Sequence, residues 1–280
     1  MTTDTTTTRS QELTDISALR LTNERGDVRV RCTTADGTAR VRLTARGDVD
    51  LGPVEVREDG AALVVVVPNL TDQDTPAGFT LRLGPLSLGS LGSGSTAVDV
   101  EVDLPGGSEV SARTKFGDIS VVGEAGRVWA RTGAGDVTVE NADRVRLASG
   151  SGDVSVRSCH GGDITTGAGD ISLDEVLGAD LQCRAGAGTV LIRHSRSDNV
   201  SIVTGSGDVT VHLSHGSLEC RSGTGSVETI VPRAVPVWLD LTSGIGRVTK
   251  DLEAVGAPED GQSHLSVRAR TGVGNVHVHH

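Results

Sequence analysis

Aromatic side chains are almost missing from this chain. Its 280 residues contain no tyrosine, two phenylalanines and two tryptophans. Aromatic rings give large, flat contact areas, and Trp129 and Trp238 are too few to line an extended sugar-binding surface of the kind that polysaccharide-degrading β-helices use. The core must therefore be aliphatic, and the 37 glycines indicate many tight turns.

Basic residues and long apolar runs are also scarce. The formal net charge is -11, and Lys115 and Lys250 are the only lysines among 26 basic residues, an arginine bias that we interpret as the mark of a GC-rich, actinobacterial genome. Nucleic-acid binding needs a basic stripe to neutralise phosphates, and the sequence shows none. The longest apolar run, 63–67, is too short to span a bilayer, and no basic segment followed by an apolar one opens the chain. We expect no transmembrane segment, no signal peptide and a cytoplasmic location, with envelope association as the alternative.

One short phrase recurs from residue 110 onward. It reads RTGAGDVTV at 131–139 and TGSGDVTV at 204–211. The second glycine returns about every 18 residues, which is typical of a solenoid. The copies are centred on Gly117, Gly135, Gly152, Gly169, Gly188, Gly207, Gly225, Gly246 and Gly274.

Apolar and polar residues alternate on both sides of each glycine pair. In one copy Val128 and Ala130 precede the turn, and Val137 and Val139 follow it. Period-two alternation indicates two strands, each with one buried face, joined by a Gly-x-Gly turn. Such a corner favours glycine because it needs positive φ or an approach too close for a Cβ atom. The predicted structural turn residues are Gly133, Gly135, Gly150, Gly152, Gly167, Gly169, Gly205 and Gly207.

Stacking equivalent strands in parallel lets these copies bury their apolar columns together. The sequence therefore predicts an all-β protein, a parallel β-helix or β-solenoid of about nine coils, with right-handed winding favoured. Cys183 and Cys220 fall in one inward column two coils apart, roughly 9.5 Å, which is too far for a disulfide. Since no CxxC spacing occurs, we expect Cys32, Cys159 and these two to be reduced and buried.

Three regions are predicted. They are a disordered tail at 1–12, an N-terminal β-rich cap region at 13–109 with a long loop at 69–97, and solenoid repeats at 110–280. Within the cap region, Leu19 and Val28 lie at the repeat's inward offsets around Gly26, which indicates a coil-like unit. The loop is interpreted as a mobile excursion, with an interaction loop or a membrane-touching loop as the alternative.

The C-terminal copy raises the question of how the stack ends. Val276 and Val278 are inward, so we expect this last copy to present an uncovered apolar cross-section. Either the insertion at 251–261 covers it, or two chains meet there in an end-to-end homo-oligomer. In the second case, His277, His279 and His280 would weaken the dimer as they become charged below about pH 6.

A family resemblance rests on three features of the sequence. They are DVEVDLPGGSEV at 99–110, TKFGDI at 114–119 and the recurring motif Gly-x-Gly-Asp-[Val/Ile]-[Ser/Thr]-Val. The sequence resembles the bacterial putative-adhesin family of β-strand-repeat proteins, a domain family of unknown function, over nearly the whole chain after the threonine tail. The resemblance implies a β-helical fold and a non-catalytic, adhesive or envelope-associated role, with no catalytic residues to carry over. The copies at Gly188, Gly225, Gly246 and Gly274 depart from the pattern because they lack the aspartate.

An aspartate follows the second glycine in several copies. The column contains Asp118, Asp136, Asp153, Asp170 and Asp208. In stacked coils these carboxylates would lie about 4.8 Å apart and repel one another, so something must offset the charge. Turn N–H groups are the favoured partners; calcium is a weak alternative, since the Gly-Gly-x-Gly-x-Asp pattern of calcium β-rolls is missing.

No constellation of residues specifies a reaction. We therefore predict a non-catalytic binding or scaffold protein without a cofactor or a designed metal site, whose partner is an unidentified protein or glycan. The alternatives are a carbohydrate-active β-helix enzyme and a calcium-binding β-repeat protein. Trp129, His277 and His279 are candidate interaction residues, because Trp129 is outward and the two histidines cluster near the end of the sequence.

Overall fold

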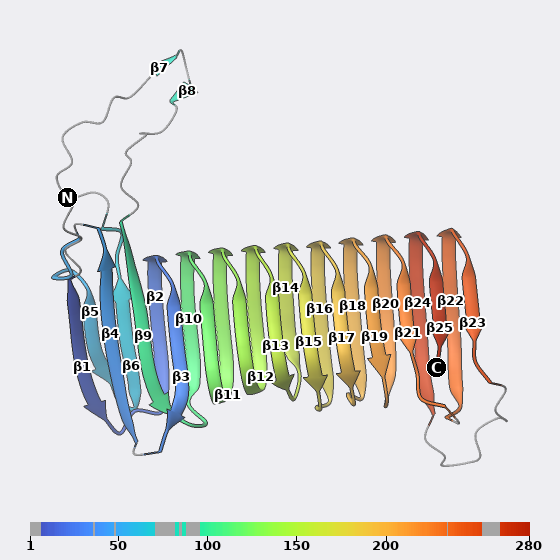
Figure 1. The fold of residues 1–280 in the computed structure, drawn as a ribbon, viewed down its shortest axis with the longest axis horizontal. Helices are drawn as coiled ribbons and strands as arrows, with labels where there is room; N and C mark the ends of the chain where they lie inside the picture. Colours follow the sequence, from blue (N-terminus) through green and yellow to red (C-terminus); the bar gives the residue numbers. More distant parts are fainter. Residues whose placement is uncertain are drawn as a thin grey trace, which may run out of the picture.

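The computed structural model describes residues 7–35, 37–47, 49–70, 82–83, 86–87, 96–233, 235–253 and 264–280. These residues form an all-β solenoid, an elongated stack of flattened coils without a helix (Figure 1). The predicted fold class is confirmed. Each of the nine copies found in the sequence forms one coil, and its second glycine sits at the turn.

Each coil consists of two strands joined by the glycine turn. We call the strand before the turn leading and the strand after it trailing; equivalent strands of successive coils pair in parallel and form a leading and a trailing sheet. In spatial order the leading sheet contains β6 (Ala62–Val67), β2 (Ala18–Arg25), β10 (Glu109–Phe116), the second halves of β11 (Ile119–Ala134) and β12 (Val137–Ser151), β14 (Gly162–Ala168), β16 (Asp180–Ala187), β18 (Asn199–Ser206), β20 (Ser217–Thr224), β24 (Leu265–Val273) and β22 (Val237–Ile245). The trailing sheet contains β9 (Ala97–Pro105), β3 (Val28–Thr34), the first halves of β11 and β12, β13 (Val154–Cys159), β15 (Ile171–Val176), β17 (Val190–Ser195), β19 (Val209–Leu213), β21 (Val227–Ile230), β25 (Val276–His279) and β23 (Val248–Asp251).

The inward columns form one continuous aliphatic core. Val137, Val154 and Ile171 are register partners in successive coils, and each is at most 1% exposed. Burying one such side chain stabilises the fold by roughly 1.5 to 3 kcal/mol. At the turn, Gly135 has a φ of 141°, and a Cβ there would lie 2.2 Å from the carbonyl oxygen of Gly117 in the preceding coil. The close stacking of the coils therefore requires glycine at this corner.

The stack does not follow the order of the sequence at its N-terminal end. The coil of β2 and β3 lies between the β6/β9 pair and the coil that begins with β10. Gly26 forms its turn with a φ of 121°. The coil-like unit predicted around Gly26 is thus a full member of the solenoid, and the predicted boundary at 109/110 does not separate solenoid from non-solenoid strands.

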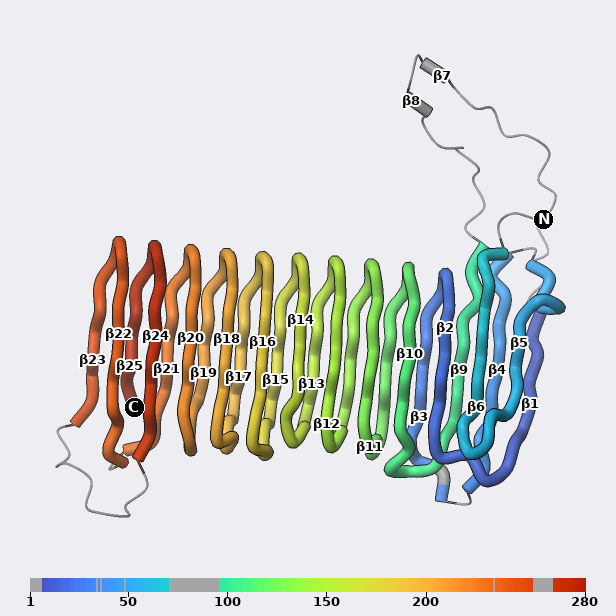
Figure 2. Tube along the Cα trace, turned by 180° about the vertical axis from the view of Figure 1, so that it is seen from behind, coloured from blue at the N-terminus to red at the C-terminus, as the bar shows by residue number. Residues whose placement is uncertain are grey.

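Antiparallel strands close this end. On the trailing side β4 (Thr38–Arg46) pairs with β9, and β1 (Thr8–Thr14) pairs with β4; on the leading side β5 (Glu55–Asp59) pairs with β6 (Figure 2). Val49, Leu51 and Val54 pack over the core and are 7%, 4% and 3% exposed. Because β1 is hydrogen-bonded along its length, the predicted disordered tail at 1–12 is wrong for residues 8–12. Most of the predicted loop at 69–97 lies outside the described residues, apart from the short antiparallel strands β7 (Arg82–Leu83) and β8 (Leu86–Ser87).

At the C-terminal end, too, the order of the coils in space differs from their order in the sequence. The last coil in the sequence, β24 and β25, lies between β20/β21 and β22/β23. Val276 and Val278 are consequently 0% exposed, and the prediction that they form the uncovered end is wrong. The end coil is β22/β23: within the described residues β22 pairs only with β24, and β23 only with β25. Its Val248 is 38% exposed.

All four cysteines are buried and free, as predicted. Ile202 separates Cys183 from Cys220 in the register, and burial raises the pKa of the Cys220 thiol to about 12. The insertion predicted to cover the end, 251–261, lies largely outside the described residues. The described part of the chain contains no helix that could cross a membrane.

Candidate functional site

The aspartate column forms a ladder of hydrogen bonds along the turns. The backbone N–H of Asp136 donates to Asp118 Oδ1 over 2.8 Å, and the N–H groups of Asp153 and Asp170 donate in the same way to Asp136 and Asp153. Asp170 and Asp208 accept from the N–H groups of Thr189 and Ser226. These contacts explain how the carboxylates stack, because each is stabilised by a donor from the neighbouring coil.

The ladder extends beyond the copies found in the sequence. Asp118 N–H donates to Asp27, and Asp27 N–H donates to Asp99, which belongs to β9. At the other end, Arg247 N–H donates to Asn275. Hydroxyls form a second row inside the turn, where Thr132 Oγ1 donates to the Gly117 carbonyl over 2.9 Å. Both rows hold neighbouring coils together.

Arginine side chains and one tryptophan cover the outer face of the leading sheet near its N-terminal end. Trp129 points outward from β11 and is 55% exposed. Its register neighbours are Ser111 and Arg146, and the side chains two residues away on the same strand are Arg127 and Arg131. We call the group formed by Arg113, Arg127, Trp129, Arg131, Arg144 and Arg146 the arginine–tryptophan patch.

The patch carries unbalanced positive charge on an acidic protein. Arg127 pairs with Glu109 over 3.3 Å and Arg146 with Asp163 over 3.8 Å. Within the described residues, the guanidinium groups of Arg113, Arg131 and Arg144 have neither an ion pair nor a hydrogen bond. Free, exposed guanidinium groups are well suited to carboxylate, sulfate or phosphate groups, which they bind through two parallel hydrogen bonds.

The surface is hollowed beside Trp129. A depression of about 590 Å³ is lined by Trp129 together with Arg127, Arg144, Arg146 and Gly162. Gly162 occupies the inward column held by Val145 and Leu181 in the neighbouring coils. The volume lies in the range of small-ligand sites.

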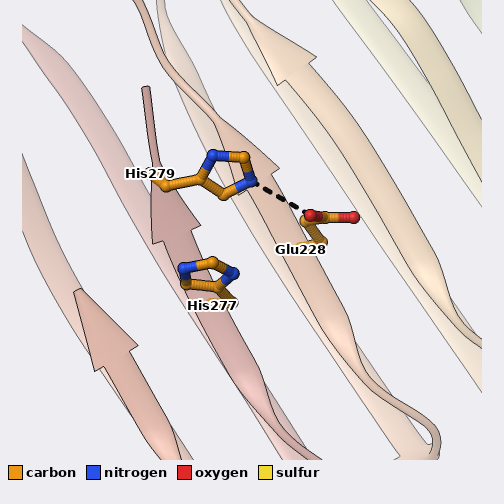
Figure 3. Close-up of side chains that lie close together, drawn as sticks. All are labelled: Glu228, His277 and His279. Carbon is orange, nitrogen blue, oxygen red and sulfur yellow. Dashed lines mark hydrogen bonds and ion pairs between the residues drawn. The ribbon is translucent and has the colours of Figure 1, made fainter. Parts of the chain in front are cut away.

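A cluster of histidines and acids lies at the opposite end, on the outer face of the trailing sheet. His277 and His279 on β25 stack with ring centroids 4.5 Å apart, and Glu228 on the neighbouring β21 reaches His279 (Figure 3). The Glu228 Oε1 to His279 Nε2 distance is 3.0 Å, and Asp251 Oδ2 on β23 lies 2.9 Å from His277 Nε2. One potential ligand atom from each of Glu228, His277 and His279 lies within 4.8 Å of the others.

Comparison with known proteins places this fold in a family. A model of the family described as Toastrack DUF4097 matches residues 16–252. The chain belongs to the Toastrack family. No curated protein matches this Toastrack sequence.

Solved structures with this Toastrack fold include a putative adhesin from Parabacteroides distasonis ATCC 8503, with 10% identity, 98% of both chains covered and a TM-score of 0.53. A putative adhesin from Parabacteroides merdae ATCC 43184 has 11% identity, covers 96% of this chain and 95% of that chain, and gives a TM-score of 0.51. A putative lipid binding protein from Parabacteroides distasonis ATCC 8503 has 11% identity, covers 96% of both chains and gives 0.52. At such identities the likeness shows the fold, and none of the three names is that of an enzyme.

The three interaction residues expected from the sequence lie in two separate places. Trp129 is in the arginine–tryptophan patch, whereas His277 and His279 lie in the distant cluster. Sequence reasoning missed the arginines around Trp129, although their alternation with Val128 and Ala130 marks Arg127 and Arg131 as outward. It also missed Glu228 and Asp251, because their approach to the histidines depends on the order of the coils.

Proposed function

We propose that this protein is a non-catalytic binding module that holds an acidic glycan on the arginine–tryptophan patch. The observation that carries the proposal is the group of three guanidinium groups without partners, Arg113, Arg131 and Arg144, around an exposed Trp129. A uronate or sulfate group supplies the charge that these arginines lack, and the indole offers an apolar face to a sugar ring.

The shape of the site favours a polymer. Arg113 and Arg131 are register partners on adjacent strands, as are Arg127 and Arg144. Adjacent strands are about 4.8 Å apart, so the charges form a short lattice on a rigid, flat sheet. A chain of charged sugars presents acidic groups at regular intervals and can engage several arginines at once, which raises its affinity through multivalency.

The two acids that pair with patch arginines are too far apart to act together in hydrolysis. Glycosidases hold two carboxyl groups about 5 to 9.5 Å apart across the scissile bond. Glu109 and Asp163 lie on β10 and β14, three strand spacings apart, which is at least about 14 Å. Both also face arginines, Arg127 and Arg146. This separation supports a binding role, as do the adhesin-like names of proteins with the same fold.

Isothermal titration with polygalacturonate tests the proposal. We expect saturable binding that weakens as salt rises, and at least about a tenfold loss of affinity, or about 1.4 kcal/mol, in Trp129→Ala and in Arg131→Ala. Neutral dextran should not bind.

Matched controls lie on the same sheet. Trp238 is an outward tryptophan that is 51% exposed, and Arg184 occupies the same outward column as Arg131 two coils beyond Ala148; Trp238→Ala and Arg184→Ala should bind as the parent protein does. Equal binding by all four variants would show that the arginine–tryptophan patch is not the binding site. Preference for phosphatidylglycerol vesicles over polygalacturonate would reject a glycan in favour of a lipid, and release of shortened or unsaturated sugars would reject a non-catalytic role.

A further inference from the structure

Three adjacent strands of the trailing sheet bring two imidazoles and two carboxylates together. β25 lies between β21 and β23, so its outward His277 and His279 have an acid on each side. In the register Glu228 is opposite His277 and Asp251 is opposite His279. The short contacts run diagonally, between His279 and Glu228 and between His277 and Asp251. Glu228 and the two imidazoles therefore cluster, and Asp251 contacts His277 from the other side of β25.

The contacts of His279 point to a cation. Its Nδ1 lies 3.2 Å from the backbone carbonyl oxygen of His280, and its Nε2 lies 3.0 Å from the Glu228 carboxylate. Both neighbours are acceptors, yet a neutral imidazole has only one N–H to donate. If Nδ1–H donates to the carbonyl, the Nε2 lone pair faces a carboxylate. A second proton or a metal ion between Nε2 and the carboxylate resolves this conflict.

We propose that Glu228, His277 and His279 form a binding site for a divalent transition metal of the zinc class, with Asp251 as a fourth ligand or as the group that orients His277. A histidine that ligates a metal through one ring nitrogen usually donates its other N–H to a carbonyl or carboxylate, and His279 has that arrangement with His280. The potential ligand atoms lie within 4.8 Å of one another, and metal binding would draw each of them to about 2 Å from the ion.

The donor set selects among cations. Two imidazoles with one or two carboxylates suit zinc and its neighbours, whereas calcium and magnesium prefer oxygen ligands throughout. Binding displaces protons from the imidazoles, since each must present a lone pair. The ion would link β21 to β25, and Asp251 would connect β23 of the end coil to the site through His277.

Titration of the full chain with ZnCl₂ at about pH 7.5, where most imidazoles are neutral, tests the site. We expect one zinc ion per chain, with a rise in thermal midpoint that grows with zinc concentration. His279→Asn and His277→Asn should abolish stoichiometric binding, Glu228→Gln should weaken it more than tenfold, and Asp251→Asn about tenfold. Calcium chloride should have no such effect.

A histidine–acid pair elsewhere provides the control. His215 Nε2 lies 3.2 Å from Asp198 Oδ1, and His215→Asn should bind zinc as the parent does. All the substituted side chains point outward, so the metal-free thermal midpoints should stay close to the parent value and verify folding. With Co²⁺ as the probe, the parent should give the intense visible absorption of a four-coordinate ion. No zinc binding by the parent, or parent-like binding by His279→Asn, would overturn the proposal.

Discussion

At the N-terminal end of the stack, antiparallel strands extend both sheets and the segment at 49–54 packs Val49, Leu51 and Val54 over the core. At the C-terminal end, β22 and β23 form the outermost coil, and Leu239 and Leu241 are only half-buried, whereas their register partners Val267 and Ala269 are fully buried. The repeat places the same inward columns at both ends. The difference shows that closure of the N-terminal end depends on segments outside the repeat. It also shows that the outermost coil of the described residues tolerates less apolar inward residues, such as Lys250, which is the partner of Val278.

The largest expected difference between the ends follows from an introduced charge. Leu51→Asp buries a carboxylate without a partner beneath the N-terminal closure, and should destabilise the protein by about 3 to 5 kcal/mol. Leu239→Asp places the same charge at a half-buried position of the end coil, where water reaches it, and should cost less than about 1 kcal/mol. Thermal and urea unfolding, followed by circular dichroism, measure both. Equal destabilisation would mean that the two ends are equally closed.

A smaller effect is expected on self-association. Within the described residues, the outer edges of β22 and β23 have no partner strand. They offer backbone N–H and C=O groups next to exposed apolar area, and a second copy of the chain can pair with them around a two-fold axis. We predict a reversible end-to-end dimer that Leu241→Arg weakens at least about tenfold, as measured by sedimentation equilibrium.

The control for association is at the other end of the molecule. Glu58→Arg on the charged edge strand β5 should leave the dimer unchanged. A monomer at every concentration would reject association through β22 and β23. The expectation that His277 and His279 weaken the dimer in acid loses its basis, because β25 lies one coil inside the edge.

The smallest effect concerns acid. Burial alone would raise the pKa of Asp27, but the N–H of Asp118 and the guanidinium of Arg46 together hold it below its usual value of 3.8. Since the pKa of Asp27 is lower in the folded chain than in the unfolded chain, its charge stabilises the fold at any pH above the unfolded-state pKa. That contribution is lost as the pH falls through the folded-state pKa. Asn275, the ladder residue at the C-terminal end, does not titrate.

The corresponding measurement compares two variants. Asp27→Asn should lower the thermal midpoint at about pH 7 and have little effect at about pH 2, whereas the effect of Asn275→Ser should be the same at both. A cost of Asp27→Asn that is independent of pH would show that the charge of Asp27 contributes nothing.

The repeat made most of the solenoid predictable, because alternation is a local property. Val137 and Val154 could be assigned inward from their own copies, and Gly135 could be assigned to a turn. The order of the coils could not be derived in this way, since any copy can stack on any other. Two signals do mark the end coil: the longer connections before Val237 and after Asp251, and Lys250 in an inward column, where a buried lysine would need a partner.

The candidate surfaces were less predictable than the core. The outward position of Trp129 follows from the alternation, but the free state of Arg131 depends on which acids lie in the neighbouring coils. Glu228 and His279 are far apart in sequence and meet only because β25 is inserted beside β21. Contacts that depend on which coils are neighbours cannot be derived from one copy of a repeat.

The inserted position of β24 and β25 has a consequence for synthesis. When the ribosome has released β22 and β23, Leu265 and the rest of the final coil have not yet emerged, and the exposed edges of β20 and β21 are the nearest templates for pairing. In the finished protein Cys220 is paired with Ala269 rather than with Leu241. A nascent chain that docks β22 on β20 early must therefore release it to admit the final coil. At the other end β9 likewise lies between β3 and β4, which both precede it in the chain, so each end of the stack has one position that a later strand must enter.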